Sequence, residues 1–292
     1  MVAVAVVSHE TRELLAACLE ALRGEADQVI VVDNASADGS AAMVRERFPE
    51  VTLVASAENL GFGPAVNLAA RRTAAPWLVP MNADVEVRPG ALAALVAAGE
   101  RHPRAGVLAP KLVTPDGAWQ HSVHPFPTLP VAAAFHLAPR RALGRRLAFE
   151  GHVDPDAPRA VDWAHGALLL VRRSAWEAAG GFDPGQWLYA EDLDLCWRVR
   201  RAGFTVRYEP SAVAVHHVSA ATAQAFGEAR HARAQAAAYA WMRRRRGPAR
   251  TRAYAGLSWA SASVRARLTG GWRRDRLREY ARWHREGWRA AR

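Results

Sequence analysis

The first hundred residues alternate short apolar runs with segments whose apolar positions recur every three or four residues. The apolar runs are typical of buried strands and cover residues 2–7, 28–32, 51–55 and 75–80. The segments with helical spacing cover residues 11–23, 38–48, 63–72 and 89–102. Strand and helix in strict alternation predict an α/β fold, with a mainly parallel central sheet and helices on both faces.

The pattern loosens after residues 107–109. Residues 110–160 are rich in Pro, His and Arg, and we expect a loop-dominated insert with a hairpin turn at Asp116-Gly117. Beyond it, strands are expected at 162–171, 205–208 and 212–216, and helices at 174–179, 191–202, 221–246, 251–268 and 273–289. The chain thus divides into a domain over residues 1–220 and a helical extension over residues 221–292.

Charge separates the same two parts. The net charge of +11 combines a balance of −3 up to residue 222 with a balance of +14 beyond it. The tail from residue 223 holds 18 Arg and 4 acidic residues, with several Trp among the arginines. Any argument from basic charge to a partner therefore concerns the extension alone.

Other bulk features limit the class of protein. Two cysteines, Cys18 and Cys196, argue against a disulfide framework or a zinc knuckle and fit a reducing compartment. No apolar stretch reaches the roughly 18 residues of a membrane-spanning helix. Residues 1–7 lack a basic leader and a cleavage site, so we expect a first strand there and not a signal peptide.

Polar residues follow several of the expected strands, where parallel α/β sheets bind ligands. They are Ser8, His9 and Glu10 after the first strand, Asp33 and Asn34 after the second, and Asn82, Ala83 and Asp84 after the fourth. Asp33 suits a hydrogen bond to a nucleobase or ribose, although this segment also resembles a helix-capping turn, with Asp38 able to cap the helix. A carboxylate such as Asp84 can hold a divalent cation, but a solvated turn residue is the simpler interpretation when it is taken alone.

A glycine-rich connection carries further candidates. Gly61 and Gly63 permit a tight turn before a helix, and Asn59 and Asn67 flank them. The chain lacks a G-x-G-x-x-G turn and a G-x-x-x-x-G-K-[ST] loop, which disfavours dehydrogenase-type and kinase-type nucleotide binding. A nucleotidyltransferase, the next enzyme class considered, would require a basic Gly-rich opening loop that is absent here.

Three carboxylates start the helix expected at residues 191–202, and two histidines end the last strand. Asp194 is explained by compensation of the helix dipole. Glu191 and Asp192 lie beside Trp187 and Tyr189, and an aromatic wall next to a carboxylate suits a sugar ring and a general base. Either His216 or His217 could complete a cation site, although a histidine at such a position is more often structural.

Taken together, these segments resemble family 2 glycosyltransferases of the GT-A fold, closest to the bacterial rhamnosyltransferase-like branch. The resemblance covers residues 1 to about 220 and rests on ordered motifs at residues 6–10, 32–40, 59–67, 82–84, 163–167, 180–183 and 189–196, with His216 after them. It implies a Rossmann-like GT-A domain and inverting transfer from a nucleoside-diphosphate sugar.

The resemblance also implies roles for the candidate residues. Asp192 would be the general base with Glu191 beside it, while Asp84 and His216 would hold Mg²⁺ or Mn²⁺. The donor would be a dTDP-, UDP- or GDP-linked sugar, and the branch suggests rhamnose. It would be bound by Ser8, His9, Glu10, Asp33, Asn34, Asn59, Gly61, Gly63, Asn67, Asn82 and Ala83. The acceptor, a hydroxyl of a glycan or lipid-linked glycan in cell-envelope polysaccharide synthesis, would contact Trp163, His165, Gly166, Trp187 and Tyr189.

The basic extension has three interpretations: a solvated face packed on the catalytic domain, attachment to an anionic membrane surface, or nucleic-acid binding. Membrane attachment is favoured because family acceptors are often lipid-linked, and nucleic-acid binding is disfavoured. We therefore expect a cytoplasmic enzyme, peripheral at the inner face of the cytoplasmic membrane. The alternative is a catalytically silent GT-A-like scaffold that recruits a glycan-assembly complex through its basic tail.

Overall fold

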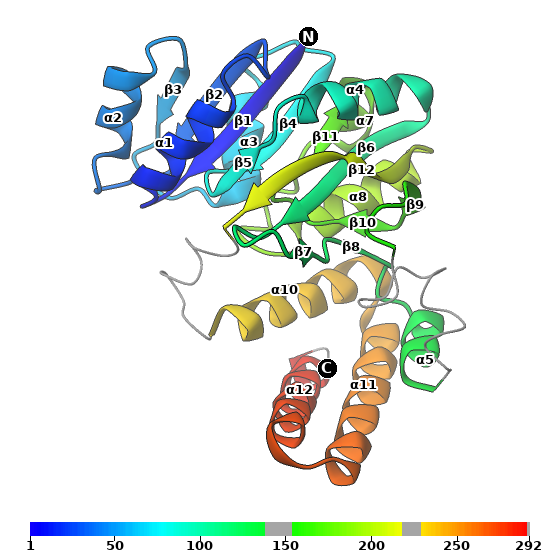
Figure 1. The fold of residues 1–292 in the computed structure, drawn as a ribbon. Coiled ribbons are helices and arrows are strands. Elements are labelled where there is room, and N and C mark those ends of the chain that lie inside the picture. Colours follow the sequence, from blue (N-terminus) through cyan, green and yellow to red (C-terminus); the bar gives the residue numbers. More distant parts are fainter. Residues whose placement is uncertain (138–153, 218–228, 291–292) are drawn as a thin grey trace. The chain divides into compact units, whose positions relative to one another are not determined.

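The computed structural model describes residues 1–137, 154–217 and 229–290 (Figure 1). The chain groups into two compact units, Met1–His124 with Asp154–Ala225, and Pro125–Val153 with Phe226–Arg292. The first unit contains the sheets and the second is helical in its described parts. Residues 125–137, which the sequence pattern placed in the first domain, group with the C-terminal helices.

The first unit is built on a ten-stranded sheet whose main path runs β3-β2-β1-β4-β11-β6-β12-β5. Its strands are β1 (Val2–Ser8), β2 (Gln28–Asp33), β3 (Thr52–Ala55), β4 (Trp77–Asn82), β5 (Val85–Val87), β6 (Ala105–Val113), β7 (Trp119–Gln120), β9 (Arg159–Val161), β11 (Leu170–Arg172) and β12 (Thr205–His216). Strands β3, β2, β1 and β4 are parallel, as are β6 and β12, while β11 and β5 pair antiparallel to their neighbours. The expected mainly parallel sheet is confirmed.

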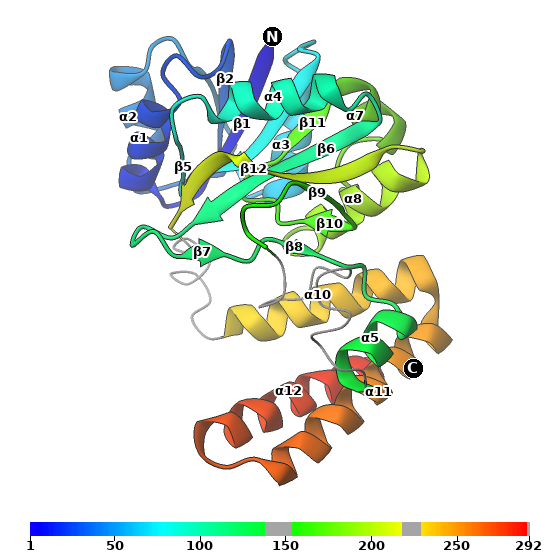
Figure 2. The same cartoon turned by 45° about the vertical axis from the view of Figure 1, so that its right-hand side comes forward.

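Helices cover both faces of this sheet (Figures 1 and 2). They are α1 (Arg12–Ala21), α2 (Ser40–Arg47), α3 (Phe62–Ala70), α4 (Ala91–Arg101), α7 (Arg173–Ala179) and α8 (Glu191–Arg201). Apolar residues of α1, α2 and α4 share one core with Val2, Val4 and Val6 of β1. Helices α3, α7 and α8 contact the sheet through other residues and form the second layer. Because both faces are covered, the central strands are apolar along most of their length.

Residues 110–160 contain more regular structure than expected. Strand β6 continues to Val113, and the turn at Gly117, with a φ of 84°, joins it to β7 as the predicted hairpin. Strands β8 (Val123–His124) and β10 (Trp163–Ala164) form a separate two-stranded sheet. The two short strands predicted at 205–216 are one strand, β12, with a register shift between Glu209 and Val213. That irregularity explains why the alternation looked broken in the sequence.

Two helix starts differ from the prediction. Gly39 and Gly90, both left-handed, occupy the N-cap positions of α2 and α4. Asp38 still satisfies the start of α2, because its Oδ1 accepts a hydrogen bond of 3.0 Å from the amide of Ser40. Pro89 precedes the first turn of α4 instead of lying in it.

The second unit contains α5 (Leu129–Leu137), α10 (Ala229–Arg246), α11 (Pro248–Leu268) and α12 (Gly271–Ala290). Helix α11 contacts α5, α10 and α12, and α12 returns along α11 as a helical hairpin (Figure 2). Gly247 separates α10 from α11, as the Gly-Pro pair predicted. Among the described helices, none combines the length and the apolar character needed to cross a bilayer.

Candidate active site

The ends of β1, β2 and β4 define the edge that carries the predicted site. Ser8 pairs with Asp33, and Val7 pairs with Asn82, so the three parallel strands finish side by side. The polar residues that follow these strands are therefore brought to one edge by strand register alone. This is the carboxyl edge at which open α/β sheets bind ligands.

Asp33 is 3% exposed at this edge. Its Oδ2 accepts a long hydrogen bond of 3.3 Å from the amide of Ser36, whereas its buried Oδ1 has no hydrogen-bond partner in the structure. A buried carboxylate oxygen without a donor is costly, and a ligand N–H or O–H would relieve that cost. Asp33 is thus set up to accept a hydrogen bond from a ligand.

The neighbouring predicted donor-binding residues tie loops together. Asn34 donates to the carbonyl of Gly61 and accepts from the amide of Leu60, at 3.1 and 3.3 Å. His9 Nδ1 lies 2.9 Å from the carbonyl oxygen of Asn34, and Glu10 accepts from the amide of Ala37 at 2.6 Å. These bonds hold the loops after β1 and β2 against the glycine-rich loop.

The Ser8 hydroxyl lies 2.9 Å from that of Thr11, which starts α1. Ser8 is buried, so this bond satisfies a hydroxyl that has lost its water. Its contact is thus to the helix start, and a role toward a nucleotide stays a prediction.

Gly61 has a specific structural reason to be glycine. A Cβ built on it would lie 2.1 Å from the carbonyl oxygen of Trp187, and its φ is +80°. The Trp187 ring donates to the carbonyl of Asn59 at 3.2 Å, and the amide of Phe62 donates to the carbonyl of Trp187 at 3.2 Å. The close approach predicted for this turn is made by the Trp187 loop.

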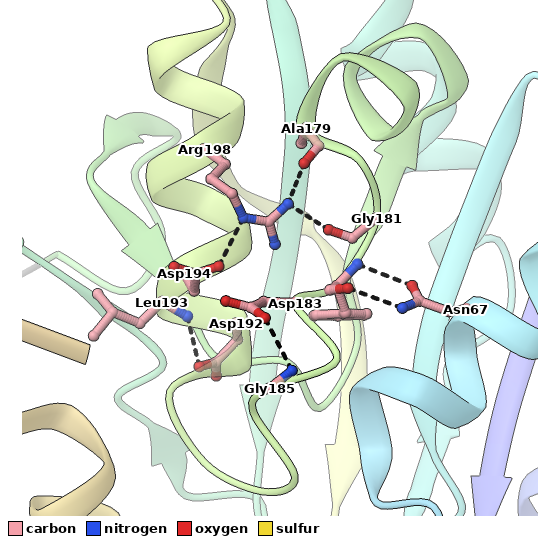
Figure 3. Close-up of polar contacts among 10 residues, drawn as sticks. Asn67, Ala179, Gly181, Asp183, Gly185, Asp192, Leu193, Asp194 and Arg198 are labelled. Carbon is pink, nitrogen blue, oxygen red and sulfur yellow. Dashed lines mark hydrogen bonds and ion pairs between the residues drawn. The ribbon is translucent and has the colours of Figure 1, made fainter. Parts of the chain in front are cut away.

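Asn67 fastens α3 to the loop after α7. Its side-chain amide donates to the carbonyl of Phe182 at 2.8 Å and accepts from the amide of the same residue at 2.9 Å (Figure 3). A Cβ on Gly63 would lie 3.0 Å from the Cβ of Phe182. Both ends of the Asn67 side chain are therefore engaged by protein, and its role toward a donor stays a prediction.

Asp84 follows β4 and faces the end of β12. It is 5% exposed, and its buried Oδ1 lies 3.4 Å from Nε2 of His216 without forming a hydrogen bond. Nδ1 of His216 lies 2.9 Å from Oε1 of Gln120. Since a carbonyl oxygen only accepts, Nδ1 is the donor in this contact, and Nε2 is the ring nitrogen that faces Asp84 Oδ1.

An imidazole nitrogen and a carboxylate oxygen that face each other at 3.4 Å are both atoms of types that bind divalent cations. His217 is engaged elsewhere, since its Nε2 lies 2.6 Å from Oε1 of Glu86. The geometry thus favours His216 over His217 at Asp84. In the part of the chain that the structure describes, no three His, Cys, Asp or Glu side chains gather as a metal site, so oxygens from a ligand would have to complete the coordination.

Asp192 lies in the first turn of α8, and two backbone amides orient its carboxylate. Its Oδ2 accepts from the amide of Gly166 at 2.8 Å. Its Oδ1 accepts from the amide of Leu193 at 2.7 Å (Figure 3). Next to Gly166, the carbonyl of Ala167 accepts from the amide of Asn82 at 3.0 Å. A short path of hydrogen bonds therefore joins the predicted base to the end of β4, just before Asp84.

Glu191 differs from its neighbour. It is buried, its Oε2 has no hydrogen-bond partner, and burial followed by the nearby charge of Asp192 raises its pKa to about 8. Glu191 is therefore mostly protonated at neutral pH. Tyr189 and Ala190 precede it with positive φ angles of 65° and 62°. Strain of this kind in non-glycine residues occurs often at functional sites.

Arg198 supports this region and was not singled out in the sequence. Its Nε donates to buried Asp194 at 2.7 Å, and its Nη1 donates to the carbonyls of Ala179 and Gly181 (Figure 3). Asp194, explained from the sequence as dipole compensation, thus forms a buried ion pair with a residue one turn later. The i, i+4 spacing of Asp194 and Arg198 was the signal that could have revealed it.

A histidine cluster was also missed. Strand pairing sets His124 opposite Trp163, and their rings stack at 4.7 Å. His124 Nε2 lies 3.0 Å from His165 Nε2, and His121 packs against His124 at 4.7 Å between ring centroids. Burial and then the two neighbouring imidazoles hold the pKa of His124 well below its usual range. The predicted acceptor residues Trp163 and His165 therefore belong to a larger aromatic group.

Comparison with known proteins decides the family. The model of the glycosyl transferase family 2 matches residues 3–156. The N-acetylglucosaminyl-diphospho-decaprenol L-rhamnosyltransferase of Mycobacterium tuberculosis is 36% identical over 214 residues, which cover 66% of this chain and 67% of that protein. The chain belongs to glycosyl transferase family 2.

Further similarities place this family 2 glycosyltransferase in the rhamnosyltransferase branch. Rhamnosyltransferase WbbL of Escherichia coli K12 is 44% identical over 57 residues, which are 20% of this chain and 22% of that protein. The solved mannosyltransferase of Pyrobaculum calidifontis, in complex with GDP-Man and Mn²⁺, has a TM-score of 0.60 at 19% identity and covers 99% of this chain and 85% of its own. The predicted GT-A fold is confirmed. The findings support a glycosyltransferase of cell-envelope glycan synthesis and do not favour the silent scaffold.

Proposed function

We propose that this glycosyltransferase moves a sugar, with rhamnose favoured, from a nucleoside-diphosphate donor to a hydroxyl of a glycan or lipid-linked acceptor, with inversion at the anomeric carbon. The observation that supports the proposal is that strand pairing and hydrogen bonds connect the segments that carry Asp33, Asp84 and Asp192 around one sheet edge. Two of these carboxylates keep a buried oxygen without a hydrogen-bond partner. The relatives named for rhamnosyl transfer favour that sugar.

Asp33 would accept a hydrogen bond from the nucleobase or the ribose, since Oδ1 is buried and has no donor. Asp84 and His216 would hold Mg²⁺ or Mn²⁺, because their facing oxygen and nitrogen fit one cation and Gln120 fixes the ring of His216. When bound, the cation would neutralise charge on the departing diphosphate. Mn²⁺ in the solved mannosyltransferase is consistent with this assignment.

Asp192 would act as the general base. The acceptor hydroxyl gives its proton to Asp192 as its oxygen bonds to the anomeric carbon, and the bond from that carbon to the diphosphate oxygen breaks on the opposite face. The amides of Gly166 and Leu193 orient the carboxylate for this step. Glu191 is less suited to the same task, because burial and the nearby charge of Asp192 raise its pKa and favour its protonated form.

Acceptor binding would fall to Trp163, His165, Gly166, Trp187 and Tyr189. The amide of Gly166 donates to Asp192, and Trp187 and Tyr189 precede Asp192 closely in the chain. Trp187 is 46% exposed, so one face of a flat apolar ring is open to a sugar. The helical unit would hold the enzyme peripherally at the inner face of the cytoplasmic membrane, where a lipid-linked acceptor is found.

A thermal-shift screen with UDP-, dTDP- and GDP-linked sugars, each with and without Mn²⁺, tests the donor. We expect one nucleotide class to raise the melting temperature, and Mn²⁺ to increase that shift, by mass action on the folded state. Asp33→Asn should lose the shift for the nucleotide alone. The absence of any shift with all three donors, combined with no transfer to a lipid-diphosphate glycan, would refute the proposal.

A further inference from the structure

The α11–α12 hairpin of the helical unit ends in exposed apolar side chains. Leu268, the last residue of α11, is 81% exposed, and Trp272, the second residue of α12, is 70% exposed. Val264, one turn before Leu268, is 53% exposed. Side chains this large are usually covered in a folded protein, so a group of them at one turn marks a contact surface.

Basic residues flank this tip and acidic ones are absent from it. Residues 229–274 contain no Asp or Glu, and Arg265, Arg267, Arg273 and Arg274 lie within three residues of Leu268 or Trp272. The first carboxylate beyond the tip is Asp275, which lies 3.7 Å from Arg278. An apolar tip with arginines on both sides of it in the chain is complementary to a membrane, whose surface can be anionic and whose interior is apolar.

A hollow of about 530 Å³ lies between α11 and α12 and adds a second observation. Its lining includes Trp259 and five arginines, Arg267, Arg274, Arg278, Arg282 and Arg285. Two of the five are paired, Arg278 with Asp275 at 3.7 Å and Arg282 with Glu279 at 3.5 Å, and both pairs are exposed. Exposed pairs are weak, so a phosphate can replace these carboxylates on the guanidinium groups.

We propose that the α11–α12 hairpin binds the surface of an anionic phospholipid bilayer. Leu268 and Trp272 enter the boundary between headgroups and acyl chains, and the arginines of the hollow bind headgroup phosphates through paired N–H groups. The inference deepens the peripheral membrane attachment proposed above and rests on it. It does not depend on the sugar, the acceptor or the identity of the catalytic base.

Co-sedimentation of the full chain with vesicles tests the hairpin. We expect binding to vesicles of phosphatidylglycerol and phosphatidylcholine, and little binding to phosphatidylcholine alone. The double variant Leu268→Ser/Trp272→Ser keeps every charge and should bind the anionic vesicles roughly tenfold more weakly. Leu129→Ser, at a half-exposed apolar residue of α5 in the same unit, is the matched control and should bind like the wild type.

A second pair of variants separates the arginine hollow from general basic charge. Arg267→Gln/Arg274→Gln and Arg244→Gln/Arg250→Gln remove the same net charge from exposed positions of one unit. The first variant should weaken vesicle binding at least threefold more than the second, because Arg267 and Arg274 line the hollow and Arg244 and Arg250 do not. Circular dichroism should show the same helix content in all variants.

Three results would overturn the inference: no binding of the wild type to anionic vesicles, equal losses for the two arginine pairs, or wild-type binding by Leu268→Ser/Trp272→Ser. Displacement from vesicles by single-stranded DNA that depends on Leu268 and Trp272 would also overturn it, in favour of a nucleic-acid site. Transfer to a water-soluble acceptor should be unchanged in the hairpin variants. An enzyme that transfers sugar but does not bind vesicles would therefore refute the hairpin inference and the peripheral attachment, and would leave the proposed sugar transfer standing.

Discussion

The sheet edge and the α11–α12 hairpin both concentrate charge, but in opposite settings. At the edge, Asp33 and Asp84 are almost fully buried, and backbone amides hold Asp192 in a fixed orientation. In the hairpin, the arginines of the hollow are exposed, and so are Asp275 and Glu279, which pair with two of them. The electrostatic attraction between a buried carboxylate and one bound atom is strong, because little water surrounds them. Each exposed arginine attracts an anion only weakly, so several must act together, and dissolved salt screens their attraction. The first setting suits chemistry and the second suits adhesion to a surface.

The largest effect is expected from Asp192→Asn. The amide keeps the shape of the side chain but cannot accept the hydroxyl proton, so transfer should fall by about 100- to 10,000-fold. Donor binding, measured by thermal shift, should persist. Glu177→Gln, an exposed carboxylate on α7, is the control and should leave both unchanged. Near wild-type turnover of Asp192→Asn would remove it from the base role.

The next effect concerns the facing pair Asp84 and His216. Asp84→Ala and His216→Ala should each reduce Mn²⁺-dependent transfer by roughly 100-fold, since either change leaves one protein ligand for the cation. His217→Ala should cost far less, because His217 contacts Glu86 instead. Titration of activity with Mn²⁺ after chelation gives the measurement. Transfer activity that does not fall after chelation would show that Asp84 and His216 do not hold a catalytic cation.

A smaller effect, on stability, tests how tightly the glycine loop is held. Gly61→Ala should lower the free energy of unfolding by about 3 kcal/mol, because the new methyl group meets the carbonyl of Trp187 and the φ is left-handed. Gly90→Ala has a similar φ of +78° with nothing within 4 Å of the new atom, and should cost about 1 kcal/mol. Urea denaturation of both variants compares them. Equal losses would mean that the loop yields and that the contact with Trp187 is not rigid.

The smallest effect is a pH dependence from His124. Its pKa is lowered in the folded protein, so the unfolded chain binds a proton first as the pH falls below about 6.5, and stability decreases there. Melting temperatures between pH 7.5 and 5.5 should decline for the wild type and decline less for His124→Gln. His102→Gln, at the end of α4, should keep the wild-type slope. Identical slopes for wild type and His124→Gln would place the acid sensitivity elsewhere.

Local sequence patterns predicted much of the first unit. The parallel strands β1 to β4 could be predicted because strands covered by helices on both faces have nearly continuous apolar sequences, which are easy to recognise. The edge strands were harder: β12 appeared as two strands because its register shifts between Glu209 and Val213. Residues 110–160 looked irregular because strands β7 and β8 have two residues each, which is too short for an alternation to show.

The candidate site divides in the same way. Asp33, Asp84 and Asp192 follow strand ends or open a helix, and those positions can be read along the chain. Gln120 and Arg198 could not be found along the chain in this way, because each acts on a distant segment. Gln120 orients His216, and Arg198 donates to the carbonyls of Ala179 and Gly181 in the segment before α8. His124 could be recognised as part of the aromatic group only from the structure, where strand pairing places it opposite Trp163.

By itself, the sequence determined the order of strands and helices, the family, and the separation of a basic tail from a near-neutral domain, because these depend on local periodicity and on residue counts. Only the tertiary structure decided that His216 and not His217 faces Asp84, that Asn67 binds Phe182, and that Leu268 and Trp272 stand exposed at a turn. The physical reason is that pairing and exposure depend on neighbours distant in the chain. Such neighbours are fixed by strand register and helix packing, which no single segment encodes.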